Sequence, residues 1–179
     1  MKKAEQRARD LLGELGIDTP PVPVDEIVER LGATISREPF RGGISGMLYR
    51  TDARAVVGVN SAEPPTRQRF TVAHEIGHFL LHEGRPLIVD RHIRVDRRDA
   101  SSSMGTKREE VEANAFAAEL LMPEEMLRRH VEALVRDDAA LPADRLANRL
   151  AREFEVSGQA MEIRLGALGF LSPLIVASG

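Results

Sequence analysis

The feature that most constrains this chain is a short motif, His74-Glu75-x-x-His78. On an α-helix, residues four positions apart lie on one face, one turn apart, so two imidazoles there can reach a single metal ion. Glu75 lies beside them and is directed at the position on a zinc ion that the protein leaves open. The motif therefore predicts a helix that carries half of a zinc site.

The residues around the motif argue against a surface helix whose histidines are only solvated. Val72, Ile76, Phe79 and Leu80 form an apolar stripe on the other side of the helix, as expected where a helix is buried in a core. A buried helix with two imidazoles and a carboxylate needs partners for those polar groups, and a metal ion supplies one. We therefore expect residues 66–82 to form the metal helix.

Composition limits the ligands and the setting. The 179 residues include no cysteine, which excludes a disulfide framework, a thiolate zinc site and a cysteine nucleophile. The formal net charge of −3 argues against a dedicated nucleic-acid surface. No signal peptide is visible, and no apolar run approaches the roughly 18 residues of a membrane helix. We expect a cytoplasmic protein without membrane contact.

The hydrophobic period changes along the chain and predicts an α+β fold. Short strands separated by turns within residues 33–60 indicate a small antiparallel sheet, packed on a helical core that contains the metal helix. A further helix, residues 107–121, is expected to supply the third ligand. We expect residues 1–137 to form this zincin-like, metal-binding core and residues 138–179 to form a helical subdomain packed on it.

The third ligand must be a histidine or a carboxylate, because zinc held by two histidines keeps room for one more protein ligand and a water. Glu110 and Asn114 lie four residues apart, so they share a face of the expected helix. Glu110 could bind the metal while Asn114 holds a ligating histidine by a hydrogen bond. Glu112 lies roughly 200° further round the helix, so we favour Glu110 over it, and Glu109 is weaker still.

The remaining histidines are weaker ligand candidates. His82 continues the four-residue row, but its Cα lies ~12 Å along the helix axis from that of His74, too far for both to share one ion comfortably. His82 also misses the third-histidine position of the HExxHxxGxxH pattern. We expect His92 and His130 on the surface, although His92 could help to stabilise an oxyanion.

Such a site would perform metal-assisted hydrolysis. Zn²⁺ lowers the pKa of its bound water and polarises the scissile carbonyl, and Mn²⁺ also suits a mixed nitrogen and oxygen ligand set. Glu75 would take the proton of the water as general base and pass it to the leaving amine.

Two further roles need residues outside the metal motif. An extended peptide could pair with the backbone of an edge strand formed by Gly46, Met47, Leu48 and Tyr49. A donor must also stabilise the tetrahedral oxyanion, and Tyr49 and Arg164 are the candidates.

Two blocks of the sequence together resemble the ImmA/IrrE family of metallopeptidases. They are residues 69–78 and residues 110–123, and their pairing is far more specific than the HExxH motif alone. The resemblance covers roughly residues 20–170. The longer radiation-response members have a C-terminal sensor-like domain without counterpart here, so the chain is more similar to the short members found on phages and other mobile elements.

The resemblance implies a gluzincin-like zinc endopeptidase. It implies His74, His78 and Glu110 as metal ligands and Glu75 as the catalytic base. It also implies a substrate, because members typically cleave helix-turn-helix repressors and so relieve repression. In the short members the repressor is often encoded nearby.

Residues 142–169 support a rival interpretation. The spacing of their apolar residues is typical of a helix-turn-helix. The chain could therefore be a DNA-binding regulator whose metal site is structural or vestigial. The second helix has one basic residue, Arg164, and one acidic residue, Glu162, which is poor for phosphate contact. We therefore favour a helical subdomain that packs on the core or docks the repressor. A third interpretation is a toxin-antitoxin setting, in which the chain binds a co-encoded protein and does not need Glu75.

Overall fold

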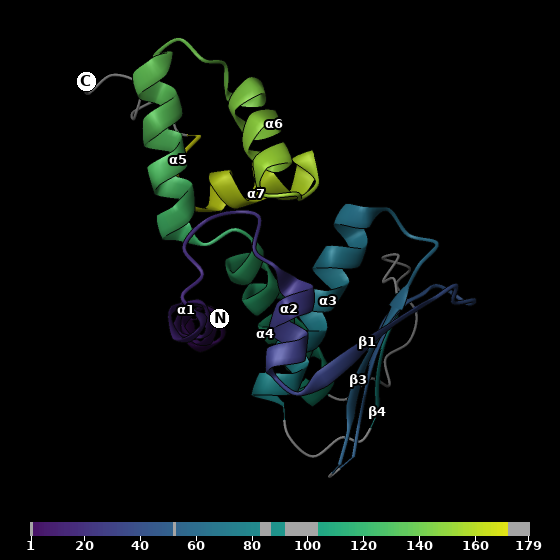
Figure 1. The fold of residues 1–179 in the computed structure, drawn as a ribbon. Coiled ribbons are helices and arrows are strands. Elements are labelled where there is room, and N and C mark those ends of the chain that lie inside the picture. The colour runs from purple at the N-terminus through teal and green to yellow at the C-terminus, as the bar shows by residue number, and fades with distance from the viewer. Residues whose placement is uncertain (1, 52, 83–86, 92–103, 172–179) are drawn as a thin grey trace.

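The computed structural model describes residues 2–51, 53–82, 87–91 and 104–171 and has an α+β fold, as predicted (Figure 1). None of the described helices has the length and apolar content needed to cross a membrane. Within these residues the elements, in chain order, are α1 (Lys2–Leu15), α2 (Val24–Arg30), β1 (Ala33–Glu38), β2 (Ile44–Arg50), β3 (Ala55–Asn60), α3 (Pro65–Leu81), β4 (Leu87–Arg91), α4 (Met104–Leu121), α5 (Glu124–Asp137), α6 (Ala143–Glu153) and α7 (Gly158–Ala167).

The four strands form one mixed sheet in the order β1-β3-β2-β4. β2 pairs antiparallel with β3 and β4, whereas β1 pairs parallel with β3. The prediction of an antiparallel sheet is therefore wrong for one of the strand pairs. Two successive reversals of the chain make β1 and β3 point the same way, and β3 then inserts between β1 and β2. The turn-forming residues in the sequence indicate where the chain reverses direction, but they do not indicate that β3 lies between β1 and β2.

β2 is an interior strand, because β3 and β4 occupy its two sides. Met47, Leu48 and Tyr49 lie opposite Val89, Ile88 and Leu87 of β4 in the register. The prediction that Gly46, Met47, Leu48 and Tyr49 form an edge strand for a peptide is therefore wrong. The backbone groups that would pair with a peptide are used by the neighbouring strands, and among the described strands the one beyond β2 on this side is β4.

The sheet approaches α3 closely at Gly46. A Cβ atom added at Gly46 would lie 2.3 Å from Cγ2 of Thr71 and 2.8 Å from Oε1 of Glu75. Leu48, the next residue on the same face of β2, is fully buried. Because glycine has no side chain, β2 can lie directly over the helix that carries the HExxH motif.

α3 and α4 also approach closely, and small residues make this contact. A Cβ atom added at Gly77 of α3 would lie 3.2 Å from the Cα atom of Ala113 and 3.2 Å from Cδ1 of Phe116, both on α4. Ala113 and Phe116 are fully buried. The two backbones therefore lie near enough for side chains from both helices to meet at one point.

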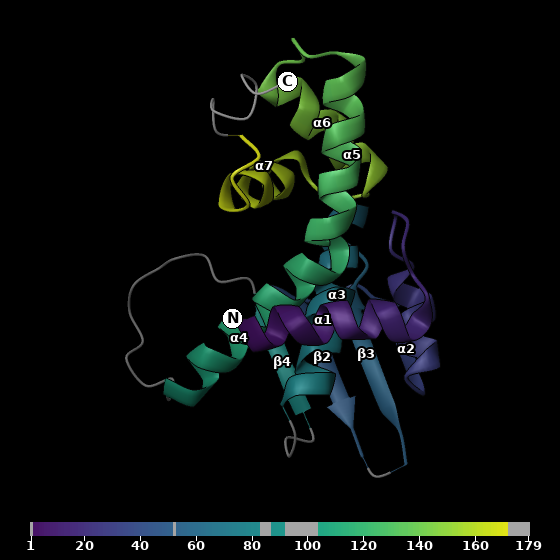
Figure 2. The ribbon, with the colours of Figure 1, turned by 90° about the vertical axis from the view of Figure 1, so that its left-hand side faces the viewer.

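The helices α5, α6 and α7 gather at one end of the molecule, and the sheet lies at the other (Figure 1). In Figure 2, α1 runs across α4 between these two ends. We call α5, α6 and α7 the helical lobe. Its core contains fully buried side chains, namely Leu150, Phe154, Met161 and Leu165. The division of the chain at residues 137 and 138 into core and subdomain stays a prediction.

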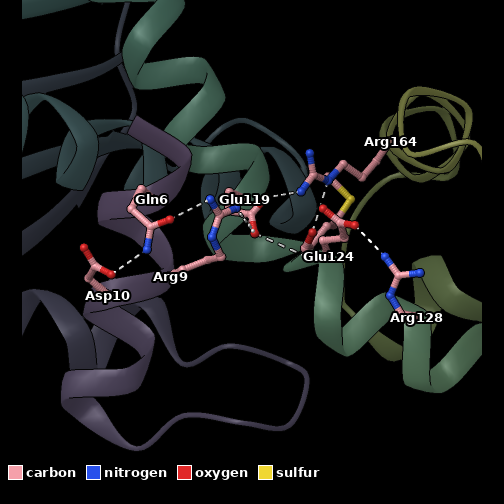
Figure 3. A network of polar contacts seen from close by, with 8 residues as sticks. Gln6, Arg9, Asp10, Glu119, Glu124, Arg128 and Arg164 are labelled. Carbon is pink, nitrogen blue, oxygen red and sulfur yellow. Dashed lines mark hydrogen bonds and ion pairs between the residues drawn. The ribbon is translucent and has the colours of Figure 1, made fainter. Parts of the chain in front are cut away.

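One buried carboxylate joins the helical lobe to the rest of the protein (Figure 3). Glu119, near the end of α4, is 1% exposed. Its Oε1 atom lies 3.1 Å from Nη1 of Arg9 on α1 and 3.4 Å from the backbone nitrogen of Glu124, where α5 begins. Arg164 of α7 donates to the other carboxylate oxygen and, through Nε, to the carbonyl of Met122 at 3.1 Å. Four helices thus meet at Glu119.

We expect Gly46→Ala to lower the free energy of unfolding by about 1–3 kcal/mol. The new methyl group must displace Cγ2 of Thr71, which is short and β-branched and has little freedom to move. Gly13→Ala is the control, because a Cβ atom at Gly13 meets nothing within 4 Å on α1. It should leave stability unchanged or raise it by up to ~1 kcal/mol. Urea unfolding followed by circular dichroism measures both, and equal stabilities would contradict the close approach of β2 to α3.

We expect Glu119→Gln to destabilise the fold by on the order of 3 kcal/mol, because it leaves the mostly buried guanidinium of Arg164 without its carboxylate. The matched control is Glu124→Gln. Its ion pair with Arg128 spans 2.6 Å on the exposed face of α5, and such pairs contribute about 0–1 kcal/mol. Thermal and urea unfolding of the two variants test this, and a small loss at Glu119 would show that the joint is held by apolar packing instead.

Candidate metal centre

The HExxH side chains lie inside the molecule. His74, Glu75 and His78 on α3 are 2%, 0% and 1% exposed. The Nε2 atoms of His74 and His78 lie 3.0 Å apart, and the two rings meet edge to face with their centroids 4.7 Å apart. The helical spacing thus turns both imidazoles toward one point, as the motif predicts.

α4 brings Glu110 to this point. Its carboxylate oxygens lie 3.3 Å from Nε2 of His74 and 3.3 Å from Nε2 of His78. One ligand atom from each of the three side chains falls within 4.8 Å of the others. Ligands held about 2.0–2.1 Å from a tetrahedral zinc ion are themselves about 3.3 Å apart, so the spacing and the donor set both fit such an ion.

Asn114 holds the outer nitrogen of His74. Its Oδ1 atom lies 3.1 Å from Nδ1 of His74. Because an amide oxygen only accepts hydrogen bonds, this contact places the proton of His74 on Nδ1 and leaves the lone pair on Nε2, where Glu110 lies. A neutral histidine in this tautomer is ready to bind a metal.

His82 holds the outer nitrogen of His78 in the same way. Their Nδ1 atoms lie 3.0 Å apart, and Nε2 of His82 lies 3.2 Å from Oε2 of Glu112. With the lone pair of His78 on Nε2, its Nδ1–H donates to His82, and Nε2–H of His82 donates to Glu112. Glu112 also accepts from Nε of Arg108 at 2.9 Å.

Sequence reasoning missed this chain of contacts from His78 to Arg108. It weighed His82 and Glu112 only as metal ligands, and the structure keeps both outside the group of three ligand atoms. The available signal was the continued row of histidines on α3 together with a second carboxylate on α4. Arg50 of β2 fixes the same region, because it donates to the carbonyls of Phe79 and His82 at the end of α3.

The protonation states of the cluster suit a metal ion. Burial lowers the pKa of His78, so its imidazole stays neutral below the usual histidine range of about 6.5. Burial alone would raise the pKa of Glu110, but hydrogen bonds and charge from His74 and His78, when those rings carry a second proton on Nε2, outweigh it and hold the pKa well below its ordinary value. A neutral imidazole and a charged carboxylate are the forms that bind metals, and metal affinity falls as pH falls because protons compete for the nitrogens.

Glu75 lies next to the cluster but outside its three ligand atoms. Its carboxylate is turned toward β2, with Oε1 2.8 Å from the position that a Cβ atom of Gly46 would take. The side chain is held between α3 and β2, one residue from His74. Its role as a general base stays a prediction.

The structure does not bring the two predicted oxyanion donors to the cluster. Tyr49 is 46% exposed and lies on the face of β2 opposite to Gly46, which faces α3. Arg164 binds Glu119, which lies nine residues beyond Glu110 on α4, about 13.5 Å along the axis. The placement of both side chains lends no support to a role as oxyanion donor, and that role stays a prediction. His92, the third candidate donor, lies outside the described residues.

Three comparisons with known proteins bear on this site. The family model of the IrrE N-terminal-like domain matches residues 28–166. The radiation response metalloprotease IrrE of Deinococcus radiodurans is 37% identical over 105 residues, which cover 59% of this chain and 29% of the relative. The protein of the same name from Deinococcus deserti is 32% identical over 155 residues, which cover 86% of this chain and 50% of the relative. The chain thus spans half or less of the length of these relatives.

A solved structure shares the fold. A Mycobacterium tuberculosis transcriptional regulator superimposes with a TM-score of 0.57 at 17% identity, over 90% of this chain and 45% of that chain. At this identity the likeness shows the fold alone.

We expect His82→Ala to weaken zinc binding by about 10–100-fold, because the ring of His78 then loses the acceptor that fixes its tautomer and orientation. His82→Asn keeps an oxygen near the place of Nδ1 and should recover part of the affinity. His130→Ala is the control, since His130 pairs with Glu153 in the helical lobe at 2.8 Å. Competition with a zinc chelator measures all three, and wild-type affinity in His82→Ala would show that His82 does not position His78.

Proposed function

The chain belongs to the family of IrrE N-terminal-like domains, and from this premise we propose that it is a zinc-dependent endopeptidase. The observation that carries the proposal is the buried group of His74, His78 and Glu110, with the carboxylate of Glu75 beside it. We further propose a helix-turn-helix transcriptional repressor as the substrate, encoded nearby, whose cleavage relieves repression. The resemblance of residues 69–78 and 110–123 to the ImmA/IrrE family supports this substrate.

His74 and His78 would hold the metal ion through Nε2, and Glu110 through its carboxylate. When bound, zinc supplies Lewis acidity, which lowers the pKa of a bound water and polarises the scissile carbonyl. Mn²⁺ would suit the same nitrogen and oxygen donors. Asn114 and His82 keep the protons of both rings on Nδ1, so each Nε2 lone pair remains available.

Glu75 would move the proton. Its carboxylate accepts a proton from the attacking water, holds it on a carboxylate oxygen, and donates it to the nitrogen of the leaving amine. The position of Glu75 between α3 and Gly46 restricts its motion, and a base held in place loses little entropy on reaching the reactive geometry.

The side chains of α7 give little support to the DNA-binding alternative. Arg164 is the basic residue of this helix, and its guanidinium is bound to Glu119. A helix that enters the major groove needs free donors for phosphates and bases. A toxin-antitoxin partner without peptidase activity remains the main rival, and Glu75 separates it from the peptidase because only hydrolysis needs that carboxylate.

We expect Glu75→Gln to bind zinc as tightly as the wild type but to cleave the neighbouring repressor at least about 100-fold more slowly, because an amide cannot take up the proton. Glu110→Gln should instead lose zinc affinity, and Glu124→Gln should behave as the wild type. Zinc content by mass spectrometry and repressor fragments on a gel measure the two properties. If Glu75→Gln relieves repression as well as the wild type, the chain acts by binding a partner.

A further inference from the structure

The helical lobe has a concave surface of its own, on elements that contribute nothing to the metal centre. A cavity of about 680 Å³ opens along α6 and the start of α7. Its polar lining comes from Arg145, Asn148, Arg149 and Arg152, and we call this surface the arginine groove. The proposed peptidase reaction does not use it.

The arginine groove has positive charge that is not fully paired within the part of the chain that the structure describes. Its three arginines lie four and then three residues apart, so they share one face of α6. Among the described residues, Arg145 and Arg149 have no hydrogen bond or ion pair from their side chains. Arg152 uses only Nε, which donates to the backbone carbonyl of Asn148 at 3.2 Å.

Most acidic residues near this face are held elsewhere. Glu153, at the end of α6, pairs with His130 of α5 at 2.8 Å, and Glu155 pairs with Arg69 of α3 at 3.2 Å. Asp144 is the remaining acid of α6 and precedes Arg145 in the first turn. The three guanidiniums therefore leave a local surplus of positive charge on a chain whose formal net charge is −3.

Part of the lining of the groove is apolar, and a helix begins beside it. Leu141 and the buried Val156 belong to this apolar part, which we call the floor. α7 begins at Gly158 with Ser157 as its N-cap, and the first N–H groups of a helix lack partners within the helix and carry partial positive charge. A Cβ atom at Gly158 would lie 3.3 Å from Oδ1 of Asn148, so α6 and this helix start lie close together.

We propose that the arginine groove binds an acidic segment of a partner protein, with carboxylates on the guanidiniums and an aliphatic side chain on the apolar floor. Guanidinium pairs with carboxylates in a fixed planar geometry, which favours such a segment. The apolar side chains of the floor offer no hydrogen-bond donors to a phosphate backbone. On α7, the basic residue Arg164 is bound to Glu119, and the negative charge of Glu162 repels phosphate. The inference goes beyond the proposed peptidase activity and needs no metal ion.

The test compares the binding of two probes to the full-length chain without metal. The first is a fluorescein-labelled peptide of glutamate, aspartate and leucine, and the second is its counterpart with glutamine and asparagine. We expect fluorescence polarisation to detect the acidic peptide only, with an affinity that falls as salt rises. The variant Arg145→Gln/Arg149→Gln should weaken this binding by at least about tenfold.

The matched control is Arg41→Gln/Arg54→Gln, which removes the same two positive charges from exposed positions outside the helical lobe. It should bind the acidic peptide as the wild type does, and both double variants should retain the wild-type melting temperature. Equal weakening by the two double variants would overturn the proposal, because it would reduce the binding to general charge attraction. Absence of binding to the acidic peptide would also overturn it, as would tighter binding of a fluorescein-labelled DNA duplex that depends on Arg145 and Arg149.

Discussion

The contact between Gly77 and Ala113 sets the distance between α3 and α4, and the metal centre depends on that distance. His78 follows Gly77 directly, and Glu110 lies three residues before Ala113, so the ligand side chains leave their helices close to the crossing. A side chain at Gly77 would lie 3.2 Å from the backbone of α4 and would move it by a few tenths of an ångström. A tetrahedral site tolerates little change in the separation of its donors, so the small residues at the crossing contribute directly to its geometry.

The close packing of α3 against α4 buries polar atoms of the metal centre, and a buried polar atom without a hydrogen-bond partner destabilises the fold. Two imidazoles of the metal centre lie within the core, and each has an outer nitrogen that needs a partner away from water. Asn114 serves His74, and His82 serves His78 and is itself satisfied by Glu112. Asn114 and Glu112 come from α4, and His82 is the C-cap residue of α3. The helix pair therefore both forms the cluster and orients it, while β2 covers it through Gly46.

The parts of the site that follow from helical periodicity could be predicted from the sequence. To predict that Glu110 and Asn114 share one face of a helix, one needs only the helical repeat. To predict that this face meets the metal motif, one needs only an argument that the helix packs beside α3. Tyr49 and Arg164 could not be assigned in this way, because strand order and ion pairs between distant helices decide where their side chains lie. His82 falls between the two cases. Its row on α3 is local, but its function depends on a carboxylate that α4 supplies.

The same dependence on tertiary contacts extends to the helical lobe. Its orientation relative to α1 and α4 is held at Glu119, where guanidiniums from Arg9 and Arg164 and the start of α5 converge. A buried carboxylate with several directional partners permits fewer arrangements than an apolar contact of the same size, since each donor must keep its angle as well as its distance. For a partner held in the arginine groove, this joint fixes where the rest of that partner lies relative to α3. A substitution at Glu119 would then change how the proposed partner lies relative to the metal centre, although Glu119 belongs neither to the ligand group nor to the groove.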